Sequence, residues 1–107
     1  MAKHLEAPEL NVRELKSELT YKGFNYKRVE QGPWGFIYAQ YLGNRRISYE
    51  IFQRKVSNAH PKSADQRPLV RFPSDESFGR WAWSFQSLDR AQAKYAELKA
   101  AYFDTGS

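Results

Sequence analysis

Hydrophobic and polar positions alternate along three runs in the first half of the chain. The runs are FNYKRVEQ at 24–31, WGFIYAQYL at 34–42 and ISYEIFQRKV at 47–56, separated by the turn sequences GP at 32–33 and GNRR at 43–46. Aromatic and β-branched residues are common in each run, as is typical of β-strands. The pattern predicts an antiparallel meander of three strands.

Apolar residues at helical spacing precede these runs. Val12, Leu15 and Leu19 recur at intervals of three and four residues, which favours one face of a helix. Asn11 stands before them as an N-cap, and Gly23 follows them as a stop signal. We therefore expect a short N-terminal helix.

A second helical pattern follows a strand near the end of the sequence. In RWAWSF at 80–85, Trp81, Trp83 and Phe85 point to one face of an extended strand. Ser87 is a candidate N-cap, and an apolar stripe at helical spacing follows it: Leu88, Ala91, Tyr95, Leu98 and Tyr102. We expect the three rings to face the core and the helix to pack on the same sheet. The alternative, in which exposed rings stack on nucleic-acid bases, would leave the helix without an adequate partner.

These elements predict a single α+β domain over residues 1–107. It consists of a short N-terminal helix, an antiparallel meander sheet of three or four strands, and a C-terminal helix packed on one face. Residues 1–10 lack periodicity, so we expect a loose N-terminal arm. Residues 57–71 are polar and contain two prolines, so we expect a long polar loop.

The composition adds a basic charge and an aromatic core. Seventeen Lys and Arg residues against twelve Asp and Glu give a formal net charge of +5, which favours polyanionic or acidic partners. The mean hydropathy of −0.78 is strongly polar, yet 16% of the residues are aromatic. Much of the core must therefore consist of rings.

Cysteine and long apolar runs are both missing from the sequence. Disulfides, thiolate metal sites and a cysteine nucleophile are therefore excluded. No run approaches the roughly 18 apolar residues of a membrane span, and the N-terminus has no secretory signal pattern. We expect a soluble, cytoplasmic chain without a membrane partner.

The two faces of the predicted meander differ in character. Strict alternation places mostly apolar residues on one face: Trp34, Phe36, Tyr38, Leu42, Ile47, Tyr49 and Ile51. It places rings and charges on the other: Ile37, Ala39, Tyr41, Glu50, Phe52 and Arg54. Rings interleaved with basic residues are typical of surfaces that bind single-stranded nucleic acid. The alternative is that the N-terminal helix covers part of this second face.

Basic residues gather near both ends of the meander. We expect Lys27 to approach Arg45 and Arg46 in the second hairpin turn, whereas Arg54 and Lys55 belong to the other end. The candidate nucleic-acid-binding residues are Lys27, Arg28, Arg45, Arg46, Phe52, Arg54 and Lys55. The alternative is that these charges only face solvent.

Signatures of catalysis are missing. His4 and His60 lack the spacing of metal ligands, and the sequence contains no glycine-rich phosphate loop or nucleophile elbow. We therefore expect no metal, no small-molecule cofactor and no enzymatic activity. Small basic ribonucleases of the RelE toxin kind resemble this chain in size, charge and a sheet flanked by helices. One short helix precedes the meander here, which departs from the opening of that family.

Three local resemblances bear on function. Residues 87–95, preceded by a strand, resemble the strand-to-helix junction of plant-type AP2 DNA-binding domains, in which one alanine-rich helix follows a three-stranded sheet. The α-β-β-β-α order is similar to that of double-stranded-RNA-binding domains. The stretch FPSDESFGRWAWSF, followed by a helix, is similar to small uncharacterised proteins of phages and mobile elements, a likeness that implies no function.

We interpret the sequence as a small basic binding module without enzymatic activity, with nucleic acid as the leading partner. The alternative is a phage or mobile-element accessory protein that binds and modulates a host protein through the ring-bearing face and residues 57–71. DNA or RNA, the number of strands, and the oligomeric state are left open at this point.

Overall fold

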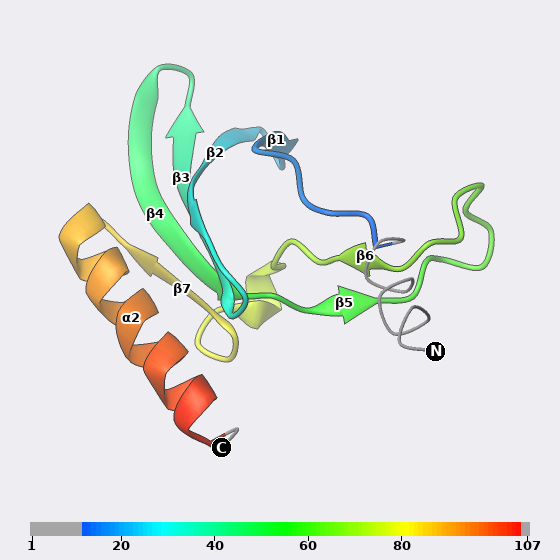
Figure 1. The fold of residues 1–107 in the computed structure, drawn as a ribbon. Helices are drawn as coiled ribbons and strands as arrows, with labels where there is room; N and C mark the ends of the chain where they lie inside the picture. The colour runs from blue at the N-terminus through cyan, green and yellow to red at the C-terminus, as the bar shows by residue number, and fades with distance from the viewer. Residues whose placement is uncertain (1–11, 106–107) are drawn as a thin grey trace. The chain divides into compact units, whose positions relative to one another are not determined.

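A computed structural model describes residues 12–105, which fall into two compact units. The larger unit contains Lys16–Arg54 and the chain from Pro73 onward, with the main sheet and the C-terminal helix. The smaller unit contains residues 12–15 and Lys55–Phe72. Figure 1 shows both units along the coloured chain.

The larger unit is built on a five-stranded antiparallel sheet. Its strands are β1 (Glu18–Tyr21), β2 (Phe24–Gln31), β3 (Gly35–Leu42), β4 (Arg45–Gln53) and β7 (Ala82–Phe85), in the order β1-β2-β3-β4-β7. Every neighbouring pair is antiparallel. The predicted α+β class and the antiparallel meander are confirmed, and β1 and β7 extend the sheet at its two edges.

The expectation of an N-terminal helix over residues 11–19 is wrong. Its second half is strand β1, which pairs with β2, and Arg13 forms an isolated bridge with Leu69. Pairing along a strand satisfies the backbone over more residues than one isolated helical turn could, so it overrides the local spacing. Asn11 and the expected arm over 1–10 lie outside the described residues.

Gly23 turns a hairpin and does not end a helix. Lys22 and Gly23 form the two-residue connection between β1 and β2, with φ angles of 52° and 85°. Two successive positive φ angles define a type I′ turn, whose twist matches that of the strands it joins. This turn fixes the β1–β2 register, in which Tyr21 lies opposite Phe24.

Helix α2 (Leu88–Thr105) covers one face of the sheet (Figure 1). As predicted, Ser87 caps it, since the backbone N–H of Arg90 donates to the Ser87 hydroxyl at 3.4 Å. Ala91 and Tyr95 are buried in a cluster with residues from the sheet and the β2–β3 loop, namely Trp34, Ile37 and Ile51. The expected packing of the helix on the sheet is confirmed.

The opposite face of the sheet is also buried. The ring centroids of Phe36 and Phe52 lie 5.3 Å apart, and those of Tyr38 and Phe52 lie 5.6 Å apart. The Tyr38 hydroxyl donates a hydrogen bond to the backbone oxygen of Lys16 at 2.8 Å. Aromatic residues therefore fill the core on both sides, as the polar composition required.

A β-bulge in β4 sets the pairing between β3 and β4. Gln40 pairs with Ser48, whereas the next residue, Tyr41, pairs with Arg46, so Ile47 is the extra residue. A one-residue shift exchanges the faces of all residues beyond it. The hairpin turn fixes the residue pairs nearest to it. Beyond the bulge, the shifted register lets both Ile51 and Phe52 be buried, on opposite faces of the sheet.

The two predicted faces of the meander are consequently wrong for β4. Ile51 lies opposite Ile37 and faces α2, together with Tyr49. Phe52 lies opposite Phe36 and faces the other way. Strict alternation from the turn does not include the bulge, so it grouped Ile51 with Phe36 and Phe52 with Ile37.

The three rings predicted on one face of the last strand are also divided. Trp83 and Phe85 pack with the α2-side cluster. Trp81 lies in a turn before β7, in which its backbone N–H donates to Ser77, and its ring packs edge-on against Phe52 at 6.4 Å. The single-turn helix η1 (Asp75–Ser77) precedes this turn.

The smaller unit contains the whole of the predicted long loop, residues 57–71. Strands β5 (Val56–Ser57) and β6 (Leu69–Val70) pair in an antiparallel ribbon at its two ends. Between them, the Gln66 side-chain amide donates to the backbone oxygen of Ser63 at 2.6 Å. The Arg67 guanidinium contacts the Asp65 carboxylate at 2.7 Å and lowers the pKa of Asp65 well below its usual range.

Candidate nucleic-acid interface

The end of the β3–β4 hairpin carries two exposed arginines. Gly43 and Asn44 form a two-residue turn, and Gly43 has a φ of 63°, as required at the first position of a type II′ turn. Arg45 and Arg46 begin β4 directly after it, and both are exposed. Figure 1 shows the hairpin continuing past the first turn of α2, so the helix leaves this end of the sheet uncovered.

Arg46 lies over the ring of Tyr49. Its guanidinium carbon is 4.9 Å from the ring centroid, within the range of a cation–π contact. On a regular strand, residues three positions apart point to opposite faces. The bulge at Ile47 brings Arg46 and Tyr49 to the same face, the one that α2 covers farther along.

Lys27 lies over the ring of Tyr41 on the same face. Its ammonium nitrogen is 5.4 Å from the Tyr41 ring centroid. Lys27 pairs with Ala39 across β2 and β3, and Ala39 in turn pairs with Tyr49. The two cation–ring contacts are therefore neighbours across three adjacent strands.

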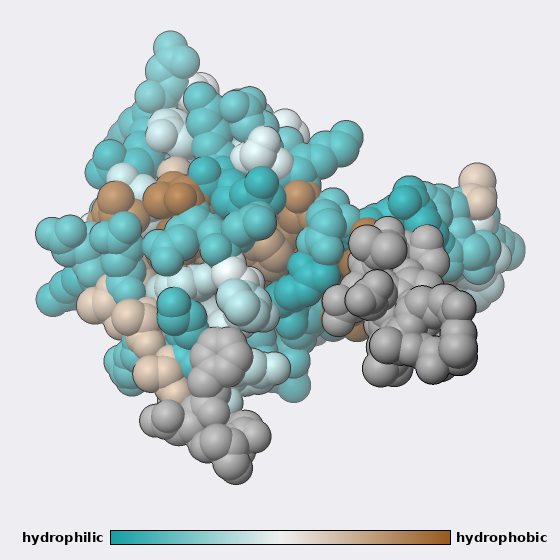
Figure 2. Space-filling view, in the orientation of Figure 1, coloured by the Kyte–Doolittle hydropathy of each residue, from teal (hydrophilic) through white to brown (hydrophobic). Residues whose placement is uncertain are grey.

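Four residues share this face and form one surface, which we call the basic–aromatic patch: Lys27, Tyr41, Arg46 and Tyr49. Arg45 pairs with Leu42 beside the hairpin turn, so it borders the patch from the opposite face of the hairpin end. The two cations of the patch and the neighbouring Arg45 are exposed, and its two tyrosines are partly buried. Glu18, opposite Lys27 on β1, is the acidic residue at its border. The hairpin end of the larger unit, at the top of Figure 2, is coloured mostly hydrophilic.

The structure brings together only some of the predicted site residues. Arg28 pairs with Tyr38, so it points to the face opposite Lys27. Arg54 follows the far end of β4, and Lys55 belongs to the smaller unit. Of the seven predicted residues, the patch holds Lys27 and Arg46, and Arg45 borders it at the hairpin end.

Phe52 requires a correction. Its ring is fully buried between Phe36, Tyr38 and Trp81, so it cannot stack on a base in this fold. Strict alternation placed it on the second face of the meander, and the bulge turns it into the core.

Tyr41 and Tyr49 were not among the predicted site residues. Alternation placed them on opposite faces of the meander, whereas the pairing across the bulge places them on one face. The available signal was that each tyrosine lies close to the arginine-bearing turn in the sequence.

A hollow of about 390 Å³ adjoins the patch at the β1–β2 hairpin. It is lined by Glu18, Leu19, Thr20, Asn25, Tyr26 and Lys27. The Thr20 hydroxyl donates to the Asn25 side-chain oxygen at 3.0 Å. The hollow shares Lys27 with the patch, and its lining is mostly polar.

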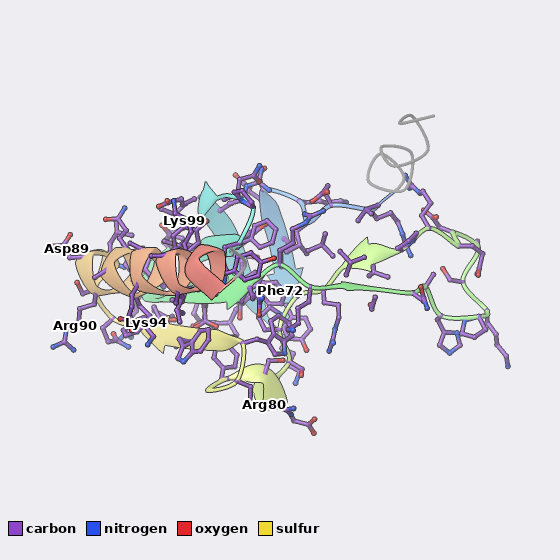
Figure 3. All side chains as sticks on the ribbon, turned by 60° about the horizontal axis from the view of Figure 1, so that its bottom comes forward. Phe72, Arg80, Asp89, Arg90, Lys94 and Lys99 are labelled. Carbon is purple, nitrogen blue, oxygen red and sulfur yellow. The ribbon has the colours of Figure 1, made fainter. Side chains whose placement is uncertain are left out.

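Two further cation–ring contacts lie on α2, away from the hairpin end. The Lys94 ammonium lies 5.8 Å from the Trp83 ring centroid, and that of Lys99 lies 5.9 Å from the Tyr95 ring centroid. Figure 3 shows the two lysines leaving opposite sides of the helix. Tyr95 is buried by the sheet, so its ring is not open to a ligand.

The buried Glu50 belongs to a row of polar side chains across the sheet. The Ser84 hydroxyl donates to the Glu50 carboxylate at 2.9 Å, and the Ser48 hydroxyl lies at the same distance from it. Farther along the row, the Gln40 amide donates to the Tyr26 hydroxyl at 2.7 Å. These contacts satisfy the buried carboxylate, which gives it a structural role.

Residues 12–105 were also compared with what a metal site, a histidine site or a membrane span requires. This part of the chain contains no cluster of His, Asp or Glu able to hold a metal ion. His60 is exposed, and its Nδ1 accepts a hydrogen bond from the backbone N–H of Lys62. Within the same residues, no helix is long and apolar enough to cross a membrane.

No protein-family model, no curated protein and no solved structure matches this chain. Its function is therefore inferred from the residues of the basic–aromatic patch.

Proposed function

We propose that this protein binds nucleic acid through the basic–aromatic patch. The observation that carries the proposal is the pair of neighbouring cation–ring contacts, Arg46 over Tyr49 and Lys27 over Tyr41, next to the hairpin end that α2 leaves uncovered. Cations neutralise phosphates, and rings stack on bases, so the two residue types together suit this ligand. The net charge of +5 would draw a polyanion toward the surface.

The number of cations sets the expected salt dependence. If Lys27, Arg45 and Arg46 each contact one phosphate, counterion release gives a slope of log affinity against log salt of about −2 to −3. The affinity should then fall roughly twenty- to fortyfold between about 50 and 200 mM salt. A ligand held by apolar contacts alone would show almost no such slope.

Fluorescence anisotropy with labelled oligonucleotides tests the proposal. Single- and double-stranded DNA and RNA are titrated at several salt concentrations, with the wild type and with the double variant Arg45→Ala, Arg46→Ala. The double variant should weaken binding and reduce the slope by about 1.5 units, since two phosphate contacts are lost. Intact oligonucleotide on a gel after incubation would agree with a binding protein and not a nuclease.

A matched control removes the same charge elsewhere. Arg80 and Lys99 are exposed in the larger unit, on the turn before β7 and on α2 (Figure 3). Ala82, two residues after Arg80, pairs with Phe52, and Tyr95, one helical turn before Lys99, bonds to Gly35, so both cations lie toward the end of the sheet far from the β3–β4 hairpin. The double variant Arg80→Ala, Lys99→Ala should leave the slope close to that of the wild type. Equal losses in both double variants would mean that only the net charge acts, and the patch assignment would be wrong.

The rival proposal is a host protein as partner. It needs a contiguous apolar surface, whereas the exposed large hydrophobic residues of the described chain come from β2, β3, β5 and α2: Val29, Leu42, Val56 and Tyr102. Binding weaker than about 100 μM at low salt for every nucleic acid tested, a free energy above about −5.5 kcal/mol, would favour this rival.

A further inference from the structure

We infer that the nucleic acid is single-stranded, and that two of its bases take the places of the Lys27 and Arg46 side chains on the rings of Tyr41 and Tyr49. The inference rests on the proposed function and adds the ligand class and the role of each ring. It is carried by the spacing of the rings, by the cations over them, and by the shape of the surface that presents them.

The spacing of the rings suits bases that are not stacked on each other. Tyr49 lies opposite Ala39, and Tyr41 lies two residues farther along β3 on the same face. Such diagonal neighbours on a sheet are about 7–8 Å apart. In a duplex, successive nucleotides of one strand rise by only about 3.4 Å. Each ring can therefore hold one base of an extended single strand, whereas a continuous base stack would not match both rings.

When nucleic acid binds, each cation over a ring can be replaced by a base. In the free protein Lys27 covers the Tyr41 ring and Arg46 covers the Tyr49 ring. A base stacked on an aromatic ring is held more strongly than an exposed cation over that ring. A base can thus displace each cation, and the flexible Lys or Arg side chain can then pair with a phosphate of the same strand.

The surface that presents the rings is a sheet face. Within a duplex the base faces are covered by neighbouring base pairs, so rings on a strand surface cannot stack on them. The bases of a single strand can turn toward the sheet. A duplex would instead meet the hairpin end, where Arg45 and Arg46 could reach phosphates or a groove, and the tyrosine rings would then contribute little.

Anisotropy titrations with labelled dT12, rU12 and a 12-base-pair duplex test the inference. We expect each single strand to bind at least about tenfold more tightly than the duplex. Replacing one base–ring stack should cost about five- to a hundredfold in affinity, so Tyr41→Leu and Tyr49→Leu should each lose that much without a change in salt slope. Tyr41→Phe and Tyr49→Phe keep the rings and should stay within about threefold of the wild type.

The controls separate loss of stacking from loss of the fold and from loss of a cation. Circular dichroism melts of each variant identify misfolded protein. Lys94→Ala removes a cation over the Trp83 ring, outside the patch, and should leave affinity within about twofold. Arg46→Ala should weaken binding and also reduce the salt slope by about 0.7 units, the value for one phosphate contact on a single strand.

A second measurement does not depend on variants. Ultraviolet crosslinking of wild-type protein to an oligonucleotide containing bromodeoxyuridine, followed by mass spectrometry, should label the peptides that contain Tyr41 and Tyr49. Equal or tighter duplex binding that the leucine variants leave unchanged and that Arg45→Ala, Arg46→Ala still weakens would overturn the inference and leave the proposed function standing. Failure of all three probes to bind would overturn the proposed function itself.

Discussion

The hydroxyl of Tyr95 donates a hydrogen bond to the backbone oxygen of Gly35 at 2.9 Å and so ties the middle of α2 to the first residue of β3. Both residues are buried, and the Tyr95 ring also packs edge-on against Trp34 at 5.6 Å. This contact anchors α2 at the end of β3 far from the β3–β4 hairpin turn. The helix leaves the hairpin end itself uncovered (Figure 1), next to the patch.

Removing that hydroxyl should destabilise the protein. The Gly35 carbonyl also accepts a hydrogen bond from the backbone N–H of Gly32 at 3.0 Å. Tyr95→Phe therefore removes one of its two hydrogen bonds, and we expect the free energy of unfolding to fall by about 0.5–1.5 kcal/mol in urea melts. Tyr41→Phe removes a hydroxyl from a partly exposed ring and should change it by less than about 0.5 kcal/mol. Equal effects in the two variants would show that the Tyr95 hydrogen bond adds nothing.

Gly35 should tolerate no side chain. A Cβ atom at this position would clash with the backbone oxygen of Phe52 and lie 2.9 Å from the Cα of Gln53, and neither backbone atom can move without breaking strand pairing. We expect Gly35→Ala to cost more than about 3 kcal/mol, an exceptional value for a single methyl group. Gly23→Asn meets open space and should cost only about 1 kcal/mol from its positive φ. Urea melts compare the two, and a smaller loss for Gly35→Ala would contradict the close packing.

The tryptophans should differ in their contributions to stability. Trp34 is 5% exposed and packs against both Trp83 and Tyr95, so Trp34→Ala should cost about 3–5 kcal/mol. Trp81 is only partly buried and lies in a turn, so its replacement by Ala should cost less, about 1–3 kcal/mol. The reverse order in denaturant melts would mean that Trp81 is the main anchor of this segment.

Stability should fall at high pH. Burial raises the pKa of the Tyr95 hydroxyl, with a smaller contribution from Glu30, and burial also raises the pKa of Tyr26. The folded protein therefore keeps both protons at a pH where the unfolded chain, with a tyrosine pKa of about 10, loses them. The resulting stability is fully present below about pH 10 and is lost as the pH rises through the folded-state pKa values. Urea melts between about pH 8.5 and 11 should show a shallower decline for Tyr95→Phe, and parallel profiles would contradict the assignment.

The sequence predicted where most strands and the C-terminal helix lie better than it predicted which face of the sheet each side chain occupies. The run at 24–31 coincides with β2, because alternation between clear turn signals is a local property. The N-terminal helix failed because three apolar residues at helical spacing are outweighed by pairing with a strand that follows in the sequence. Burial of Ile51 against α2 and of Phe52 on the other side requires the bulge, and no local sequence signal marks it.

In the candidate site, too, the residues predicted from the order of the strands were placed correctly, and those assigned to a face by alternation were not. Lys27, Arg45 and Arg46 gather because a hairpin and its neighbouring strand bring them together, which the meander alone predicts. Phe52 and the two tyrosines were assigned by alternation, and alternation fails beyond Ile47. The partners of each ring depend on the β3–β4 register, which the whole core determines.

The Ile47 bulge also has a consequence for how chains of this kind can diverge. Because Ile47 is the unpaired residue, deleting it would join Arg46 to Ser48 with every pair from Tyr41 to Phe36 unchanged. The deleted protein should keep nucleic-acid affinity within a few fold in the anisotropy assay, and a loss as large as that of Arg46→Ala would contradict this register. In an alignment of related chains, a one-residue gap at Ile47 would preserve the surface. A gap of the same length later in β4 would turn Tyr49 away from Arg46, so gap position would separate chains that keep the patch from those that have lost it.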